Sequence, residues 1–460
     1  MITTVKRILK LDGFSPSQKI AISFFVVILL GACLLTLPIS NVDGEVFSFI
    51  DALFMATSAT CVTGLAVAAP ALQFTVFGQI VLLLLIQIGG LGLMSMVASI
   101  ALSIRKKLSV QNKLAMREML NQTNMLDFRK FLFGIIRFTF IFEIIGAIIL
   151  SFAFVPEYGL RGIYISIFTS VSAFCNAGFD IIGSSSLVEY VNNPIVNFTV
   201  MALIIAGGLG FIVYFDLRDK FKAFFKKKIS FKMLKQRLML QTKIVIVVTS
   251  ILIFVPALII FILEYSNPET LGNLGLDGKI YGALFSSVTL RTAGFATIDF
   301  AGFYPASQFI MIICMFIGGS PGGTAGGIKT TTLAIILMNV ICNIRGQEKT
   351  SLFHRHISRD LIVRSTTILV INLGILFLGI FGLLVICDFD FMSIVFEAVS
   401  ALATVGLTLG ITTLLPTVAK IIIIILMYVG RIGIFTFLVS VIRQETKKSV
   451  DYAEGNIMIG

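Results

Sequence analysis

The sequence contains little charge and no tryptophan. Only 13% of its 460 residues are charged, whereas 57% are hydrophobic. Soluble globular domains carry about 25% charged residues, so this composition excludes a water-soluble protein of this size. It predicts a chain with several helices that cross a membrane.

Residue types that bind metals or perform catalysis are also scarce. The six cysteines have neither metal-ligand spacing nor a secreted disulfide pattern: Cys33, Cys61, Cys175, Cys314, Cys342 and Cys387. The two histidines, His354 and His356, stand in a basic stretch and fit a solvated loop better than a metal site. The hydrophobic runs hold no constellation of His, Asp, Glu and Cys. The sequence therefore argues against an enzyme and predicts no cofactor in this chain.

Eight hydrophobic runs are candidates to cross a bilayer core of about 30 Å. They are Ile20–Leu37, Phe74–Ile104, Phe131–Val155, Val196–Phe215, Ile244–Leu263, Phe309–Ile341 with an interruption, Ser365–Cys387 and Thr417–Val441. The first run lacks a small-residue cleavage site, so we interpret it as a retained span. We expect an all-α integral membrane protein with eight spans.

The positive charges predict the orientation of these spans. Of the 36 Lys and Arg residues, 30 lie in the N-terminal segment, 105–137, 218–243, 345–364 and the C-terminal segment. The positive-inside rule makes these segments and both termini cytoplasmic. Topology therefore explains the net charge of +12 without nucleic acid as a partner, and the stretch Arg218–Lys243 suits contact with anionic lipid.

A short motif that ends in glycine occurs four times. The copies are Thr57–Leu65, Ser172–Phe179, Ser287–Phe295 and Ser400–Leu407, and their glycines, Gly64, Gly178, Gly294 and Gly406, are 114, 116 and 112 residues apart. Such spacing predicts four tandem copies of one unit. We place these units at 1–128 with the N-terminal segment, 129–240, 241–358, and 359–460 with the C-terminal tail.

Each unit contains a segment too short and too polar to cross a membrane: Phe47–Cys61, Gly162–Cys175, Lys279–Arg291 and Phe391–Thr404. We expect a helix that dips in from the outer side, followed by chain that returns without helical structure. Such chain is tolerated only inside protein or along a wet cavity, and its carbonyls can replace the water around a cation. The predicted filter consists of Val62, Thr63, Gly64, Asn176, Ala177, Gly178, Thr292, Ala293, Gly294, Thr404, Val405 and Gly406. A single such glycine is more often a packing residue.

The second span of the third unit contains a glycine-rich run, residues 318–327, that should break its helix. A phosphate loop is the rival interpretation, but the flanking membrane span argues against it. Three cations lie at membrane depth, Arg291, Lys329 and Arg431, and such groups usually have a function. The predicted gate consists of Gly318, Gly319, Pro321, Gly322, Gly323, Gly326, Gly327, Lys329 and Arg431. We expect Arg291 to brace the third filter segment through hydrogen bonds, with Glu143 and Glu397 as candidate partners of the buried cations.

The four glycine segments and the run Gly318–Lys329 resemble the KtrB/TrkH family of bacterial potassium uptake proteins, and the length favours the KtrB branch. The resemblance implies a fold like four K⁺-channel subunits fused in tandem around one pore, and Arg431 resembles the family's gate arginine. It implies K⁺ as substrate, a homodimer, a cytoplasmic ring of nucleotide-binding regulatory subunits (RCK-type, KtrA-like) and a bacterial plasma membrane. It leaves open a role for Na⁺ as activator. The alternative is a coupled secondary cation transporter, a symporter that uses Na⁺ or H⁺.

Overall fold

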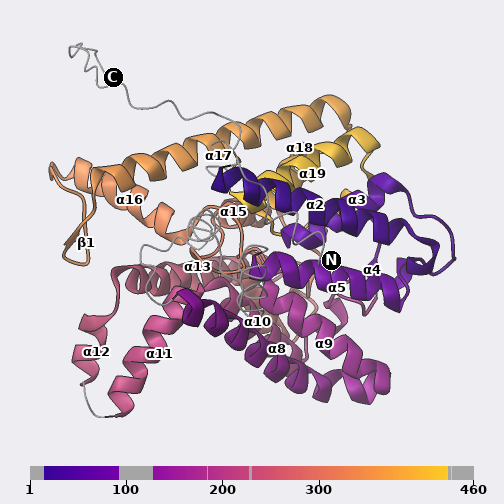
Figure 1. Cartoon of the computed structure of the whole chain (residues 1–460), viewed down its shortest axis with the longest axis horizontal. Coiled ribbons are helices and arrows are strands. Elements are labelled where there is room, and N and C mark those ends of the chain that lie inside the picture. Colours follow the sequence, from indigo (N-terminus) through magenta and orange to yellow (C-terminus); the bar gives the residue numbers. More distant parts are fainter. Residues whose placement is uncertain (1–14, 93–127, 184, 227–229, 434–436, 438–460) are drawn as a thin grey trace.

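The structure is a computed structural model that describes residues 15–92, 128–183, 185–226, 230–433 and 437. Helices form almost all of it (Figure 1). One short antiparallel hairpin, β1 (Ser351–Leu352) and β2 (Arg355–His356), lies among them. The helical class predicted from the sequence is therefore confirmed.

The order of a long helix, a short helix and a second helix occurs four times along the chain. The long helices are α2 (Pro16–Thr36), α8 (Phe128–Tyr158), α13 (Leu240–Glu264) and α17 (Arg359–Ile386). The short helices are α3 (Phe49–Cys61), α9 (Leu160–Cys175), α14 (Leu276–Thr289) and α18 (Phe391–Ala403). The second helices are α5 (Val76–Leu91), α10 (Pro194–Gly208), α15 (Pro305–Phe316) and α19 (Thr417–Ile432).

The remaining helices connect these elements. They are η1 (Pro38–Ser40), α4 (Pro70–Gln73), η2 (Val188–Tyr190), α11 (Phe211–Phe225), α12 (Phe231–Arg237), η3 (Phe300–Gly302), α16 (Thr330–Ile344) and η4 (Thr412–Leu414). The limits placed between the four units stay predictions, and the first of them adjoins the undescribed residues 93–127.

The four long helices are each long and apolar enough to cross a membrane. The start of α2 illustrates their local determinants. Ser15 accepts a hydrogen bond from the Gln18 amide through its hydroxyl, and the Gln18 side chain accepts one from the Ser15 amide. This capping box, with Pro16 at the first helical position, fixes where the helix begins.

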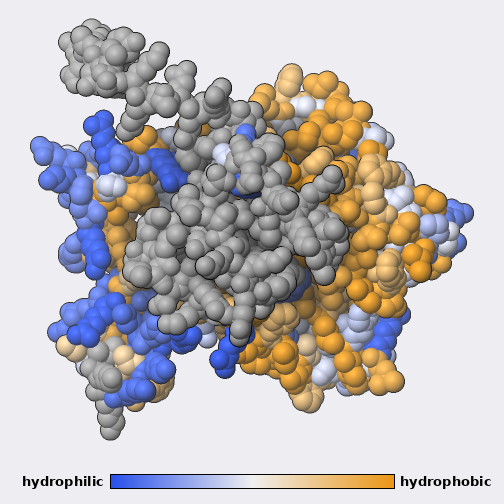
Figure 2. Space-filling view, in the orientation of Figure 1, coloured by the Kyte–Doolittle hydropathy of each residue, from blue (hydrophilic) through white to orange (hydrophobic). Residues whose placement is uncertain are grey.

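Apolar and polar side chains are segregated on the molecular surface. Figure 2 shows hydrophobic residues over much of the visible helical face and hydrophilic residues near α11, α12 and the hairpin. On α17 the side chains of Phe377, Leu378 and Phe381 are exposed. Exposed apolar residues on this scale are typical of a surface that contacts lipid or another membrane protein.

The predicted span Val196–Phe215 is wrong as a single helix. It is divided into α10 and α11, which meet at an angle of 99°. Gly210, with φ 88°, lies at the break. The backbone groups freed there are paired by the glycine-rich loop (residues 318–327), because Gly208 O accepts from Ser320 N at 3.0 Å and Phe211 N donates to Gly322 O at 3.0 Å. Because these backbone groups are paired, the chain can bend sharply here without leaving unsatisfied amides and carbonyls away from water.

Two of the other second helices also stop at glycines. Helix α5 ends before Gly92 (φ 77°) and α19 before Gly433 (φ 89°), so the predicted continuations to Ile104 and Val441 fall almost entirely outside the described residues. The predicted interruption of the sixth run is present, as the loop between α15 and α16.

Glycines also let the second helices touch the ends of the short helices. An ideal Cβ on Gly89 would lie 2.0 Å from Thr60 O, and one on Gly430 would lie 1.9 Å from Leu402 O. Gly207 has the same relation to Phe174 O, at 2.0 Å. These contacts fix the short helices in place.

The first and last units lie side by side (Figure 1). Lys420 of α19 forms a salt bridge with Asp51 of α3, with 2.6 Å between Nζ and Oδ1. Tyr428 of α19 donates a hydrogen bond of 2.7 Å to Ala21 O in α2. The chain therefore closes on itself.

We expect Gly430→Ala to lower the thermal midpoint of the purified protein in detergent. Its Cβ would overlap the Leu402 carbonyl, and overpacking of this kind costs roughly 1–3 kcal/mol. Gly374→Ala is the matched control, because Gly374 lies within α17 and an added Cβ meets nothing within 4 Å. Equal midpoints for the two variants would contradict the close contact.

Candidate functional site

The four predicted filter segments have a common backbone conformation. We call residues 62–64, 176–178, 292–294 and 404–406 the ring segments. Each begins with a residue in the left-handed region: Val62 (φ 57°), Asn176 (59°), Thr292 (62°) and Thr404 (53°). Each ends with a glycine of positive φ: Gly64 (101°), Gly178 (70°), Gly294 (79°) and Gly406 (93°). The middle residues do not have positive φ. Glycine is the residue that tolerates such angles at no steric cost.

The ring segments meet at their glycines. Each ring glycine lies against the middle residue of another ring segment. An ideal Cβ on the glycine would come close to the carbonyl oxygen of that residue. The distances are 2.7 Å from Gly64 Cβ to Ala177 O, 2.7 Å from Gly178 Cβ to Ala293 O, 2.8 Å from Gly294 Cβ to Val405 O, and 2.1 Å from Gly406 Cβ to Thr63 O. The contacts thus run from the first segment to the second, third and fourth, and back to the first. A side chain at any of these glycines would displace a carbonyl of its neighbour.

Hydroxyl groups on the short helices form hydrogen bonds that hold three of the ring segments. Ser58 Oγ accepts a hydrogen bond of 3.1 Å from Gly64 N, and Ser400 Oγ accepts one of 3.1 Å from Gly406 N. In the third segment, Thr289 Oγ1 instead donates to Phe295 O at 2.7 Å. Sequence reasoning missed these residues, although serine stands six positions before Gly64, Gly178 and Gly406.

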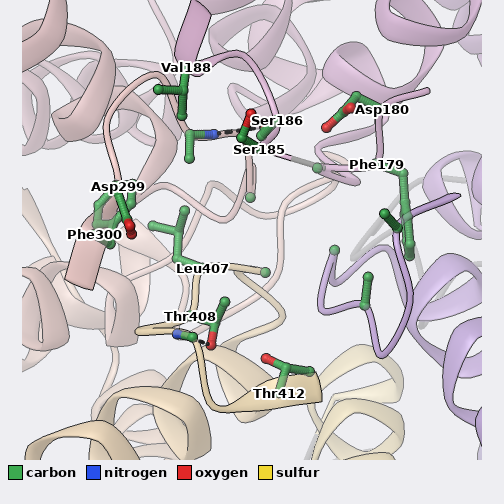
Figure 3. A pocket seen from close by; sticks show the side chains of 18 of the residues that line it. Phe179, Asp180, Ser185, Ser186, Val188, Asp299, Phe300, Leu407, Thr408 and Thr412 are labelled. Atoms are coloured by element: carbon green, nitrogen blue, oxygen red, sulfur yellow. Dashed lines mark hydrogen bonds between the residues drawn. The ribbon is translucent and has the colours of Figure 1, made fainter. Parts of the chain in front are cut away.

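A cavity of about 630 Å³ opens beyond the four glycines (Figure 3). We call it the mouth cavity. The residues two positions after each glycine all line it: Ala66, Asp180, Ala296 and Thr408. Asp180 and Asp299 contribute carboxylates to its wall, and the hydroxyls of Ser186 and Thr412 contribute further oxygens. The cavity therefore offers oxygen atoms and negative charge next to the ring.

Asp180 is the most enclosed carboxyl group of the mouth cavity. It lies in the loop between α9 and α10 and is 7% exposed. Its Oδ1 accepts a hydrogen bond of 3.3 Å from Ile182 N. Burial raises the pKa of Asp180 to about 6, against the opposing effect of hydrogen bonds from Ile182, Ser186 and Gly183. Sequence reasoning missed this residue, because an aspartate follows the glycine at this position in one segment only.

The glycine-rich loop contacts the other side of the ring. Thr324 Oγ1 lies 2.9 Å from Asn176 Oδ1 and 3.1 Å from Phe174 O. Gly326 N donates to Thr292 Oγ1 at 3.0 Å. An ideal Cβ on Gly326 would lie 2.0 Å from Thr404 Oγ1. The loop therefore touches the first residue of three ring segments, on the side away from the mouth cavity.

The remaining predicted gate residues shape this loop. Gly318 N donates to Ile328 O at 3.0 Å, and Gly319 N to Gly326 O at 3.2 Å. Gly322 (φ 74°) and Gly327 (φ 63°) have left-handed conformations. Pro321 and Gly323 lie against the bend between α10 and α11, where Gly323 faces the carbonyl of Gly207 and Pro321 O faces Gly210.

Two of the three predicted cations contact the loop. The guanidinium of Arg431 donates to Thr324 O and to Gly89 O, which links the loop to the first unit. Lys329 Nζ donates to Ala325 O at 2.8 Å and to Gly326 O at 3.3 Å. Both side chains therefore contact the loop through its backbone carbonyls.

The expected bracing role of the Arg291 side chain is wrong. Arg291 is 2% exposed, and none of its side-chain nitrogens has a hydrogen-bond partner in the described part of the chain. The guanidinium lies beside Gly208, whose carbonyl already accepts from Ser320 N. Only the main chain of Arg291 links two segments, since its carbonyl accepts from Asn176 Nδ2 at 3.3 Å.

The two buried glutamates do not pair with these cations either. Glu143 Oε2 accepts from Gln87 Nε2 at 3.4 Å, and Glu397 accepts from two threonines. Within the described ranges neither forms a salt bridge. Glu143 belongs to α8 and Glu397 to α18. The described side-chain partners of both carboxyls are neutral groups, so the expected pairing with the cations is wrong.

A family model for cation transport proteins, TrkH, matches residues 8–452. The chain belongs to the TrkH family of cation transport proteins. It is 41% identical to the Ktr system potassium uptake protein B of Bacillus subtilis (strain 168), over 99% of both chains. It is 39% identical to the potassium/sodium uptake protein NtpJ of Enterococcus hirae, over 97% of both. The crystal structure of the potassium transporter TrkH from Vibrio parahaemolyticus has the same fold, with a TM-score of 0.73, 18% identity, and coverage of 94% of this chain and 86% of that one.

The family assignment confirms the resemblance inferred from the glycine segments. The family consists of membrane transport proteins and is not an enzyme family. The geometry described above is therefore that of a cation transport protein.

We expect cation uptake at low cation concentration to fall several-fold as the pH outside the mouth cavity drops from about 7 to about 5. Over this range Asp180, with a pKa of about 6, changes from mostly ionised to mostly protonated. Once protonated, Asp180 has no negative charge to attract cations to the mouth cavity. Uptake of radioactive rubidium into proteoliposomes measures the effect.

Asp180→Asn should give low uptake that no longer depends on pH over this range. The matched control is Asp277→Asn, because Asp277 is exposed at the start of α14 and does not line the mouth cavity. An unchanged pH profile in Asp180→Asn would exclude this role.

Proposed function

We propose that this chain is the channel-like translocating subunit of a K⁺ uptake system, and that the ring segments are its selectivity filter. The observation that carries the proposal is the closed series of glycine–carbonyl contacts among four segments. The names of the relatives support K⁺, since they are potassium and potassium/sodium uptake proteins. We place the protein in a bacterial plasma membrane with both termini in the cytoplasm.

The proposed filter would act through backbone oxygens. The carbonyls of Thr63, Ala177, Ala293 and Val405 are next to the glycines of neighbouring segments, where they can replace water around a dehydrated cation. The short helices end at the ring segments, so the negative ends of their dipoles lie close to the cation. The carboxylates of Asp180 and Asp299 would raise the local cation concentration at the outer entrance.

The glycine-rich loop with Arg431 and Lys329 is the proposed gate. It lies against three ring segments on the inner side. A unit positive charge 4 Å from a cation costs about 4 kcal/mol at an effective dielectric constant of 20. The gate must therefore move for conduction, and a loop built from glycines can change its backbone angles more easily than a helix.

Control of this gate would come from other chains. The Bacillus subtilis relative is part of a Ktr system by name, which supports a regulatory partner. We propose a homodimer of this chain, a cytoplasmic ring of nucleotide-binding subunits (RCK-type, KtrA-like), and anionic lipid at the basic segments. K⁺ is the transported substrate, and Na⁺ is a candidate activator.

The filter is tested by flux of radioactive rubidium into proteoliposomes with K⁺ or Na⁺ as competitor. Wild-type protein should be inhibited far more strongly by K⁺ than by Na⁺. Gly178→Ser should lose most of this preference, because its Cβ would lie 2.6 Å from Gly294 Cα and 2.7 Å from Ala293 O.

The matched control is Gly183→Ser in the same outer loop, where an added Cβ meets nothing within 4 Å. Gly183→Ser should keep the wild-type preference. The filter assignment fails if folded Gly178→Ser discriminates between K⁺ and Na⁺ as wild type does. Uptake that requires a Na⁺ or H⁺ gradient in fixed stoichiometry would instead favour a symporter.

The gate is tested by deletion of residues 322–326. The deletion removes Thr324 and Gly326, which bond to Asn176 and Thr292, so K⁺ flux should rise and no longer depend on a cytoplasmic subunit. Arg431→Ala should raise flux more weakly, because the loop itself remains. Rubidium flux from purified protein, with and without the partner, measures both effects.

Arg161→Ala is the control, since Arg161 is exposed on α9. Monodispersity in detergent shows whether each variant is folded. A folded deletion variant that conducts no faster than wild type would make the loop a purely structural element.

A further inference from the structure

The fourth short helix contains a buried carboxyl group at a position where the other three have none. Nine positions before each ring glycine, the chain has Met55, Thr169, Phe285 and Glu397. All four side chains are fully buried. A buried carboxyl group is costly unless hydrogen bonds compensate it, so Glu397 must have partners that the apolar residues Met55 and Phe285 do not need.

The partners of Glu397 lie in the loop that follows the fourth ring segment. Its Oε2 accepts from Thr408 Oγ1 at 2.7 Å, and its Oε1 accepts from Thr412 Oγ1 at 2.6 Å. Thr408 Oγ1 in turn accepts from Gly410 N at 3.0 Å. Both threonines line the mouth cavity, where Figure 3 shows them near one another.

These bonds hold the fourth ring segment on both sides of its glycine. Ser400, which also belongs to α18, accepts from Gly406 N. Glu397 holds Thr408, two residues beyond Gly406. Because Gly406 lies against Thr63 of the first segment, the two attachments to one rigid helix fix where the ring closes.

We propose that Glu397 is a positioning residue that, through Thr408 and Thr412, sets the place of the fourth ring segment and thereby the discrimination between alkali cations. The inference rests on the proposed filter. Selectivity in such a filter depends on how many carbonyl oxygens surround the cation and on how they are held, so a tether at this point affects selectivity directly. Glu397 itself does not touch the cation, because the threonines separate it from the cavity.

The test compares two substitutions of Thr408. Thr408→Val keeps the shape of the side chain but removes the hydroxyl, whereas Thr408→Ser keeps the hydroxyl. Thr408→Val should reduce the ratio of inhibition by K⁺ to inhibition by Na⁺ about tenfold, which lies within the range for the loss of one buried hydrogen bond. Thr408→Ser should stay close to wild type. The effect should appear in the apparent KM for each cation more than in the maximal rate.

Glu397→Gln gives a second measurement. Its amide has one acceptor oxygen, so the side chain can accept from one threonine hydroxyl but not from both in the present way. Its selectivity ratio should lie between those of wild type and Thr408→Val. Thr413→Val is the matched control, because Thr413 lines the same cavity and is exposed.

The ratio relative to wild type decides the inference, and the wild-type ratio itself decides the proposed function. Folded Thr408→Val with an unchanged ratio overturns the positioning role, as does an equal loss in Thr408→Ser or in Thr413→Val. Where Glu397→Gln does not fold, the Thr408 pair decides alone. A wild-type protein without preference for K⁺ contradicts the proposed function. Even then, a change in the ratio of K⁺ to Na⁺ inhibition in Thr408→Val, but not in Thr408→Ser, supports the positioning role of Glu397.

Discussion

The pairing of backbone polar groups away from water is the constraint on which the rest of this structure depends. An unpaired amide or carbonyl in hydrocarbon costs several kcal/mol, yet the chain leaves helical structure at the four ring segments, in the glycine-rich loop and at the break between α10 and α11. The glycine-rich loop and the break between α10 and α11 satisfy one another, because Gly207 and Gly208 accept from Thr324 and Ser320. Neither irregular segment could exist at this depth alone.

This mutual pairing joins parts of the molecule that serve different purposes. The first amide of α11 is bonded to Gly322 O, while the same loop reaches the ring through Thr324 and Gly326. A displacement of α11 must therefore move the loop or break its bonds. The ring, the glycine-rich loop and α11 form one mechanical unit, since packed and hydrogen-bonded elements move between discrete arrangements.

Composition and spacing were sufficient for the helical class, the four long spans and the four short helices, because apolar length and recurring glycines are local properties. They were not sufficient for the bend between α10 and α11, since the similar stretch Ile88–Gly92 ends α5 directly before the undescribed residues and gives no sign of a bend to compare. The bonds that decide the bend come from a loop more than a hundred residues later. The partners of Glu397 and the isolation of Arg291 are likewise set by tertiary contacts. The proposed roles of the filter and gate residues stay predictions.

The closure between the first and last units has a consequence for how the protein is made. Asp51 of α3 pairs with Lys420, and Thr63 O meets Gly406, at the opposite end of the sequence. During synthesis from the N-terminus, the first short helix is complete long before α18 and α19 exist. The ring can therefore close only after α18 and α19 have been made, and a chain truncated before them would leave Asp51 and the Thr63 carbonyl without these contacts.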